Sequence, residues 1–369
     1  MLNFLKDMVA IESPSNNKKA LHNIIKFLET KFMSLGFYTI HAKGEKGGGY
    51  LYARPFKRKE NSPLQLLLGH CDTVWDLSTL NTMPISQSKG KLNGPGVYDM
   101  KAGLTEIIFA LLAIKTLKLD LPVTPIILIN SDEEVGSHES TPTIKRLSKI
   151  VKRAFVLEPP LGIDGKLKTQ RKGIGRFTVT IKGRATHAGL DPEKGINAIV
   201  ELAHQVQKLY AMNDFDKGIT VNVGLIEGGT SANVVAAASN AVIDVRVYNK
   251  EDGDYITKKI HQLKPMLDDV ELVIEGGIGR QPMEKTSRNR QLWKLAKANA
   301  KLIGISLDEA TAGGGSDGNT TSLYTATLDG LGTTGDGAHA THEFIYVDKL
   351  IERTALLTLL LLENSNENK

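Results

Sequence analysis

The sequence predicts an α/β protein whose main domain is interrupted by a smaller α+β domain. Apolar runs of strand length alternate with helical patterns up to Glu158, and the segment 172–277 then follows the order β-α-β-β-α-β of a ferredoxin-like sandwich. The helical and strand-like pattern resumes after Arg280. A chain of 369 residues also exceeds the usual single core. We therefore expect one domain built from 1–171 and 278–369, with 172–277 inserted into it.

The first part of the chain has the pattern of two helices followed by strands. Apolar residues recur at helical spacing through 1–35, and the polar segment 13–17 between them suits a turn and a helix N-cap. Strands are predicted at 37–42 and 50–54, joined through three glycines at 47–49. A helix is predicted over 104–117.

Three apolar runs each end in a residue that can bind a metal ion. The run 65–69 is followed by His70, the run 125–130 by Ser131-Asp132-Glu133-Glu134, and the run 154–157 by Glu158. In open α/β sheets, ligands bind at the carboxyl ends of the strands. These side chains are therefore expected to meet although they are far apart in the sequence.

Later segments complete the two domains. In the insert we expect a strand over 175–183, a helix over 196–212, strands over 219–225 and 241–247, a helix over 254–267 and a strand over 270–274. Beyond it we expect a helix over 292–303, an apolar run over 328–331 and a helix over 350–361. The β-α-β-β-α-β order of the insert predicts a compact unit of its own.

The composition is that of an ordinary soluble globular protein, with 41% hydrophobic and 24% charged residues. The net charge of +5 comes from basic residues interleaved with acidic ones, so nucleic-acid binding is not expected. The single cysteine, Cys71, excludes an intrachain disulfide and a cysteine-rich zinc site, and we expect it to be a buried structural thiol. No run approaches membrane-spanning length and the N-terminus lacks a secretory pattern, so we expect a cytoplasmic protein without membrane contact.

The segment His70-Cys71-Asp72 has the pattern of a metal ligand and its orienting carboxylate. In an extended backbone residues i and i+2 point the same way, so Asp72 can accept one ring N–H of His70 and leave the other nitrogen for a metal ion. Cys71 then points away from both.

Five residues at strand ends and in glycine-rich loops are candidate metal ligands, namely His70, Asp99, Glu134, Glu158 and His339. Imidazole and carboxylate without thiolate form a hydrolytic ligand set for two divalent ions, most readily zinc, with cobalt or manganese as alternatives. Taken singly, each residue also has a structural interpretation as a turn, strand-end or loop residue. Their joint placement favours a metal site.

The neighbouring residues Glu133 and Glu134 are predicted to have different roles. Adjacent side chains on an extended chain point in opposite directions, so one carboxylate can bind metal while the other faces the substrate. A carboxylate beside the attacking water is placed to act as a general base and then as an acid to the leaving amine.

Motifs along nearly the whole chain resemble those of the co-catalytic zinc metallopeptidase and amidohydrolase family. They are Gly69-His70-Cys71-Asp72-Thr73-Val74, Gly94-Pro95-Gly96-Val97-Tyr98-Asp99-Met100-Lys101-Ala102-Gly103, Asp132-Glu133-Glu134-Val135-Gly136-Ser137, Glu158-Pro159 and Thr186-His187-Ala188-Gly189. The family includes acetylornithine deacetylase, succinyl-diaminopimelate desuccinylase and glutamate carboxypeptidase. The resemblance implies a zinc-exopeptidase-like catalytic domain with a mixed sheet flanked by helices.

The resemblance also implies roles for individual residues. His70 and Glu158, with Glu134 and His339, would complete two separate metal sites, and Asp99 would bridge the two ions. Asp72 would orient His70, and Glu133 would be the catalytic base. For the last ligand both His339 and His342 lie in the closing motif, and the spacing of His339 four residues before Glu343 favours His339.

In this family the insert forms homodimers through a helix and an edge strand. The histidine matched by His187 reaches the active site of the partner, where it would stabilise the tetrahedral oxyanion. On its own, His187 would be interpreted as a turn histidine.

The form of the His70 motif and the glycine run before Ser316-Asp317 resemble the glutamate carboxypeptidase branch most closely. By that resemblance Arg246 and Arg280 would hold the carboxylate of the substrate and Asn233 would contact it, although the basic run 166–172 departs from the family pattern. The expected activity is cleavage of the amide bond of a C-terminal amino acid, in a peptide or an N-acyl amino acid, by a water activated between two metal ions. The alternatives are an N-acyl amino acid deacylase, such as acetylornithine deacetylase, and an inactive metal-binding scaffold.

Overall fold

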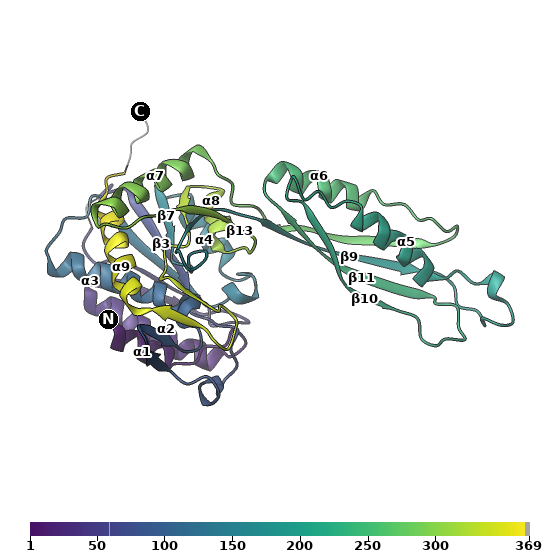
Figure 1. Cartoon of the computed structure of the whole chain (residues 1–369), viewed down its shortest axis with the longest axis horizontal. Coiled ribbons are helices and arrows are strands. Elements are labelled where there is room, and N and C mark those ends of the chain that lie inside the picture. Colours follow the sequence, from purple (N-terminus) through teal and green to yellow (C-terminus); the bar gives the residue numbers. More distant parts are fainter. Residues whose placement is uncertain (59, 366–369) are drawn as a thin grey trace. The chain divides into compact units, whose positions relative to one another are not determined.

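The chain forms two compact units, shown in Figure 1 in a computed structural model that describes residues 1–58 and 60–365. The first unit comprises 1–169, 285–311 and 316–369, and the second comprises 170–284 and 312–315. The predicted insert, 172–277, lies within the second unit.

A six-stranded mixed sheet is the centre of the first unit. Its order is β1-β2-β6-β3-β7-β14, in which β6, β3, β7 and β14 run parallel and β1 and β2 run antiparallel to their neighbours. The strands are β1 (Phe37–Ala42), β2 (Tyr50–Pro55), β3 (Leu64–His70), β6 (Thr124–Asn130), β7 (Arg153–Val156) and β14 (Ala326–Leu328). The prediction of an α/β fold with a mixed sheet is confirmed.

Helices cover this sheet and explain why its central strands are continuous apolar runs. Alternate residues such as Leu67 and Ile127 join the larger core with the helices α1 (Leu2–Val9), α2 (Lys18–Leu35), α3 (Ala102–Thr116), α7 (Ser287–Leu302) and α9 (Val347–Leu362). Their neighbours Leu66 and Leu128 pack with Ile144 of α4 (Thr141–Ser148) in a second core. Strands buried on both faces carry apolar residues at every position.

Several short elements have too few residues to show a periodic pattern and were not predicted. A second sheet has the order β15-β16-β5-β4 and contains β4 (Ser86–Ser88), β5 (Lys91–Asn93), β15 (Gly335–Asp336) and β16 (Phe344–Tyr346). Two further strands, β8 (Leu167–Arg171) and β13 (Glu309–Ala312), pair with each other, and α8 covers Asp317–Ser322. The turns are η1 (Thr79–Asn81), η2 (Val97–Lys101), η3 (Glu133–Val135) and η4 (Pro192–Lys194).

The second unit has the predicted ferredoxin-like arrangement. Its elements are β9 (Gly173–Lys182), α5 (Ala198–Tyr210), β10 (Thr220–Gly228), β11 (Ala238–Val247), α6 (Lys250–His261) and β12 (Glu271–Arg280). They form an antiparallel sheet of order β10-β11-β9-β12, against which α5 and α6 pack (Figure 1). In β9 the residues Phe177, Val179 and Ile181 are buried in the core, and the residues between them are more exposed.

The sheet of the first unit brings three strand ends to one edge. β3 ends at His70, β6 at Asn130, and β7 at Val156, two residues before Glu158. Since these strands are parallel neighbours, the residues that follow them lie at the same end of the sheet. Cys71, which follows His70, is buried in the core as predicted. Within the described residues no helix is both long and apolar enough to span a membrane, and a cytoplasmic location stays a prediction.

Candidate metal centre

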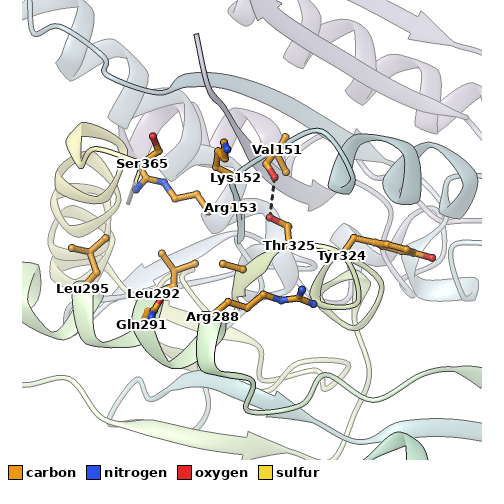
Figure 2. A pocket seen from close by; sticks show the side chains of 11 residues that line it. Val151, Lys152, Arg153, Arg288, Gln291, Leu292, Leu295, Tyr324, Thr325 and Ser365 are labelled. Atoms are coloured by element: carbon orange, nitrogen blue, oxygen red, sulfur yellow. Dashed lines mark hydrogen bonds between the residues drawn. The ribbon is translucent and has the colours of Figure 1, made fainter. Parts of the chain in front are cut away.

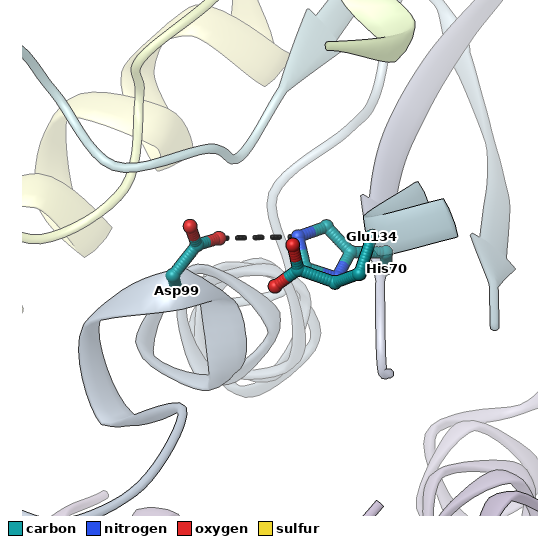
Figure 3. A group of neighbouring side chains, drawn as sticks. All are labelled: His70, Asp99 and Glu134. Carbon is teal, nitrogen blue, oxygen red and sulfur yellow. Dashed lines mark hydrogen bonds and ion pairs between the residues drawn. The ribbon is translucent and has the colours of Figure 1, made fainter. Parts of the chain in front are cut away.

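The five predicted ligands meet at the carboxyl edge of the six-stranded sheet. Ligand-type atoms of His70, Asp99 and Glu134 lie within 4.8 Å of one another (Figure 3). The same holds for His70, Glu133 and Glu158. His339 joins the group from the loop before β16, where its Nε2 lies 3.1 Å from Glu134 Oε2.

Asp99 stands between the two imidazoles. Its Oδ1 lies 3.1 Å from His70 Nε2, and its Oδ2 lies 3.5 Å from His339 Nε2. His70 Nε2 is also 3.6 Å from Glu158 Oε1. The shortest contacts thus form two sets that share Asp99, one with His70 and Glu158 and the other with His339 and Glu134, although Glu134 also lies within 4.8 Å of His70. His342 lines the adjoining pocket instead.

Asp72 is fully buried and contacts both His70 and the turn η3. Its Oδ1 lies 3.4 Å from His70 Nδ1, although the nearer partner of that nitrogen is the backbone carbonyl of Asp72 at 3.0 Å. The carboxylate also accepts the backbone N–H groups of Glu133 and Glu134 and the hydroxyl of Ser15. Asp72 therefore orients the imidazole from the side opposite Asp99 and fixes the start of η3 as well.

The extended backbone assumed for Glu133 and Glu134 is wrong. Both residues lie in the helical turn η3, which closes with Gly136 at a φ of 99°. The turn forms because Asp72 accepts the N–H groups of both residues. The helical turn, and not strand alternation, sets the directions of the two side chains, and each places a carboxylate oxygen within 4.8 Å of a ligand atom of His70.

Buried charges in the cluster require positive partners. Burial raises the pKa of Glu134, and its Oε1 is a buried oxygen that lacks a hydrogen-bond partner among the described residues. Hydrogen bonds with Asp99 and Glu134 raise the pKa of His339 to about 10. Burial raises the pKa of Asp99, but hydrogen bonds with His339 and His70 outweigh it and hold that pKa well below its usual range. A group of closely spaced carboxylates with imidazole nitrogens facing inward fits divalent cations of the zinc type.

Asp317, which was not predicted as a site residue, accepts hydrogen bonds from residues on both sides of the turn η3. Its Oδ2 accepts from Asn130 Nδ2 at 2.6 Å, and its Oδ1 accepts from the hydroxyl of Ser137. Asn130 ends β6, and Ser137 follows Gly136, so the two contacts enclose Glu133 and Glu134. Such contacts leave no periodic signal in a sequence.

A pocket of about 460 Å³ adjoins the cluster and has room for a small substrate. Its lining includes Asp99 and Glu158 together with Tyr98, Lys168 and Asp336. Lys168 belongs to the basic run that departs from the family pattern, and its side chain is largely buried.

The remaining predicted residues belong to the second unit and form two groups there. Arg246 and Arg280 both pair with Ile174 of β9, from its two sides. Arg246 donates to both carboxylate oxygens of Asp244, at 2.7 and 3.0 Å. His187 pairs with Val234 beyond the other end of β9, and the carbonyl of Asn233 accepts the N–H of Ala188. His187 and Asn233 are exposed.

A cavity of about 540 Å³ lies at the start of β7, at the opposite end of the strand from Glu158. Figure 2 shows the side chains that line it. It is lined by Val151, Lys152, Arg153, Arg288, Gln291, Leu292, Leu295, Tyr324, Thr325, Ala326 and Ser365. Arg153 donates to the carbonyl oxygens of Leu360, Glu363 and Asn364 at the end of α9, and Arg288 donates to that of Ser322 at the end of α8. Both arginines therefore stabilise helix C-termini.

Comparisons with known proteins agree with the motifs. Residues 169–264 match the peptidase dimerisation domain. The chain is 28% identical to carboxypeptidase G2 of Pseudomonas sp. (strain RS-16), over 97% of this chain and 88% of that protein. It is 26% identical to succinyl-diaminopimelate desuccinylase of Dechloromonas aromatica, over 87% of this chain and 88% of that protein.

Solved structures share the fold. The aminopeptidase PepT of Bacillus cereus superimposes with a TM-score of 0.80 at 23% identity, covering 98% of this chain and 96% of that one. The YXEP protein of Bacillus subtilis, a dinuclear metal-binding peptidase of the M20 family, gives a TM-score of 0.73 at 14% identity, with 98% and 96% coverage. The resemblance inferred from the sequence motifs is thus confirmed, as is the prediction of a hydrolase that acts on amide or peptide bonds.

Proposed function

Since this chain belongs to the M20 family of peptidases and amidohydrolases, we propose that it is a dinuclear zinc hydrolase that releases a C-terminal amino acid from a peptide or an N-acyl amino acid. The main support is the position of Asp99, whose two carboxylate oxygens face two imidazoles that each have a further carboxylate beside them. Asp99 would bridge one ion held by His70 and Glu158 and a second held by His339 and Glu134.

Glu133 would perform the proton transfers. Two divalent ions bound at the cluster would supply Lewis acidity toward the amide carbonyl and toward the attacking water. Glu133 has a carboxylate oxygen within 4.8 Å of ligand atoms of His70 and Glu158, so it can remove a proton from the attacking water. The same carboxyl group then returns the proton to the leaving nitrogen, and His187 would stabilise the negative charge on the carbonyl oxygen.

Arg246 and Arg280 would bind the free carboxylate of the leaving amino acid. Residues opposite one another on neighbouring strands point to the same face of a sheet, so both side chains flank that of Ile174. A Cβ atom at Gly315 would lie 2.8 Å from Ile174 Cδ1 and 2.9 Å from Arg280 Cδ, so a larger residue there would displace these two side chains. Asp244 orients Arg246 by a two-point contact through Nε and Nη2, and Nη1, which makes a long contact of 3.5 Å with the carbonyl oxygen of Gly313, would donate to a carboxylate.

His187 would come from the second subunit of a homodimer. The two arginines lie level with Ile174, whereas His187 and Asn233 lie beyond Lys182, eight residues further along β9. At roughly 3.3 Å per residue the two groups are about 26 Å apart within one insert. A small substrate cannot contact both ends of the same insert, which supports a site that also takes residues from a partner.

The activity is tested by supplying N-acyl glutamate, a peptide with C-terminal glutamate and N-acetylornithine to the zinc-loaded protein. We expect release of free glutamate from the first two, with kcat/KM at least about tenfold above that for N-acetylornithine, because a guanidinium pair can also attract the side-chain carboxylate of glutamate but repels the side-chain ammonium of ornithine. Chromatographic detection of the free amino acid measures each rate.

Other outcomes of the same assay favour the rival functions. A preference for N-acetylornithine would favour the deacylase. Binding of two zinc ions without release of amino acid from any substrate would favour the inactive scaffold.

An apolar surface on the insert would form the dimer interface. β10 is an edge strand of the sheet, and its residues Leu225 and Ile226 are 64% and 56% exposed. On α5, Ile199 and Val200 are exposed as well. An open strand edge with exposed large apolar side chains is typical of a surface that pairs with another chain.

Replacing both Leu225 and Ile226 by lysine is expected to produce monomers. Lysine charges at the centre of an apolar interface would be desolvated without partners, which we expect to raise the dimer Kd by roughly 100-fold or more, or about 2.7 kcal/mol. Light scattering after size exclusion measures the mass. Tyr255→Lys, at an exposed position on α6, is the control and should remain dimeric. A dimeric double variant would contradict this interface.

A further inference from the structure

Glu343 is a buried carboxylate beside the candidate metal centre, but it faces backbone N–H groups and not the cluster of ligands. It is fully buried and lies directly before β16, four residues after His339. Its two oxygens accept four hydrogen bonds from three backbone N–H groups and one indole N–H. A carboxylate has only acceptors, so this set of donors suits its ionised form.

The donors are divided equally between the two oxygens. Oε1 accepts from the N–H groups of Tyr98 at 2.8 Å and Asp99 at 3.0 Å. Oε2 accepts from the N–H of Gly96 and the indole of Trp75, both at 2.9 Å. The carboxylate thereby fixes the turn that carries Asp99, including the amide of Asp99 itself.

The backbone of Glu343 is tied to the loop that carries His339. Its N–H donates to the carbonyl of Ala340 at 2.9 Å, and the N–H of Ala340 donates to that of Gly337 at 2.8 Å. His339 lies between them with a φ of 62°, which is uncommon for a residue other than glycine and persists only where the surroundings enforce it. One residue therefore connects the two chain segments that carry Asp99 and His339.

We propose that Glu343 is a positioning residue that sets the spacing between Asp99 and His339, and so the affinity for the second metal ion; this inference rests on the proposed function, in which these two residues are ligands. Residues that orient a metal ligand without touching the metal commonly change metal affinity by roughly 10- to 100-fold when they are replaced.

The substitution Glu343→Gln tests this role with almost no change in size. Glutamine has one acceptor oxygen and one amide NH₂ donor. Because each carboxylate oxygen receives two N–H donors, the NH₂ group must face two donors in either orientation. Two hydrogen bonds are lost, and the Asp99 turn is pushed away from the His339 loop.

The measurement is a cobalt titration of the metal-free full chain, followed by visible absorption and by metal analysis. We expect wild type to take up two ions and Glu343→Gln to bind the second ion roughly 10- to 100-fold more weakly, with an altered cobalt spectrum. Trp75→Phe, which removes one donor and leaves the carboxylate, should weaken the same step by a smaller factor. It also serves as the test if Glu343→Gln does not fold.

Glu12→Gln is the matched control. Glu12 also accepts two backbone N–H groups, those of Ser78 and Leu80, but the loop it holds carries no predicted ligand. We expect two ions at wild-type affinity for this variant. Folded Glu343→Gln with wild-type affinity for both ions would overturn the positioning role.

The readout separates this inference from the proposed activity. If the wild-type protein binds two ions but hydrolyses no substrate, the proposed activity is wrong, and the metal-affinity test of Glu343 still stands. A wild-type chain that takes up no second ion would overturn both.

Discussion

Glu133→Gln is expected to lower kcat by roughly 10²- to 10⁴-fold while the protein keeps both metal ions. The amide is close in size to the carboxylate but cannot accept a proton from the attacking water or return one to the leaving nitrogen. The KM should change little, because Glu133 would act on the water and not on the groups that bind the substrate. Initial rates with N-acyl glutamate and metal analysis of the same sample provide the measurement.

Glu134→Gln is the informative comparison, since Glu134 is the neighbour of Glu133 and would be a metal ligand. Glu134 Oε2 lies 3.1 Å from His339 Nε2, so its replacement should weaken binding of the second ion as well as lower the rate. Glu133 also lies close to His70 and Glu158, and it could instead complete a metal site. Loss of one ion by Glu133→Gln would assign it that role, and a near-normal rate with both ions bound would rule it out as the base.

The convergence of the candidate ligands could be predicted because it follows from strand direction. β3, β6 and β7 are buried central strands, so their apolar runs are uninterrupted and their ends are marked by the first polar residue. Parallel neighbours then bring His70 and Glu158 to one edge of the sheet. No knowledge of side-chain packing is needed for that step.

The supporting residues could not be predicted, because they act through hydrogen bonds to distant backbone groups. Glu343 accepts from groups some 244 to 268 positions earlier in the chain, and Asp317 from Asn130 and Ser137. The turn η3 was missed for the same reason, since it depends on Asp72 as the acceptor for its N–H groups. The position of Glu343 four residues after His339 was the one sequence signal that could have identified it.

The insert has one feature that could be predicted from the sequence and one that could not. Its topology was predictable, since alternating strands such as β9 bury every second residue against two helices. The separation of the arginines from His187 and Asn233 depends on strand register, which the hydrophobic pattern of one strand does not reveal. The resemblance to the family assigned His187 to the partner subunit, and the register gives an independent reason for that proposal.

Removal of metal is expected to abolish turnover and to lower the melting temperature. The cluster gathers carboxylates of low exposure whose repulsion bound cations would relieve. An ion present at about 100 times its Kd stabilises the folded state by about 2.7 kcal/mol, so chelation should lower Tm by several degrees. Calorimetry before and after dialysis measures this shift, and added zinc, cobalt or manganese should restore both properties.

The number of ions lost by single variants tests the two-set arrangement directly. Asp99→Asn is expected to weaken both sites, because its two oxygens face both imidazoles, whereas His339→Ala should release only one ion. His342→Ala is the neighbouring control and should keep two, since the imidazole in contact with Asp99 and Glu134 is that of His339. If Asp99→Asn retained two tightly bound ions, or if His342→Ala lost one, the ligands would not be divided as the distances around Asp99 indicate.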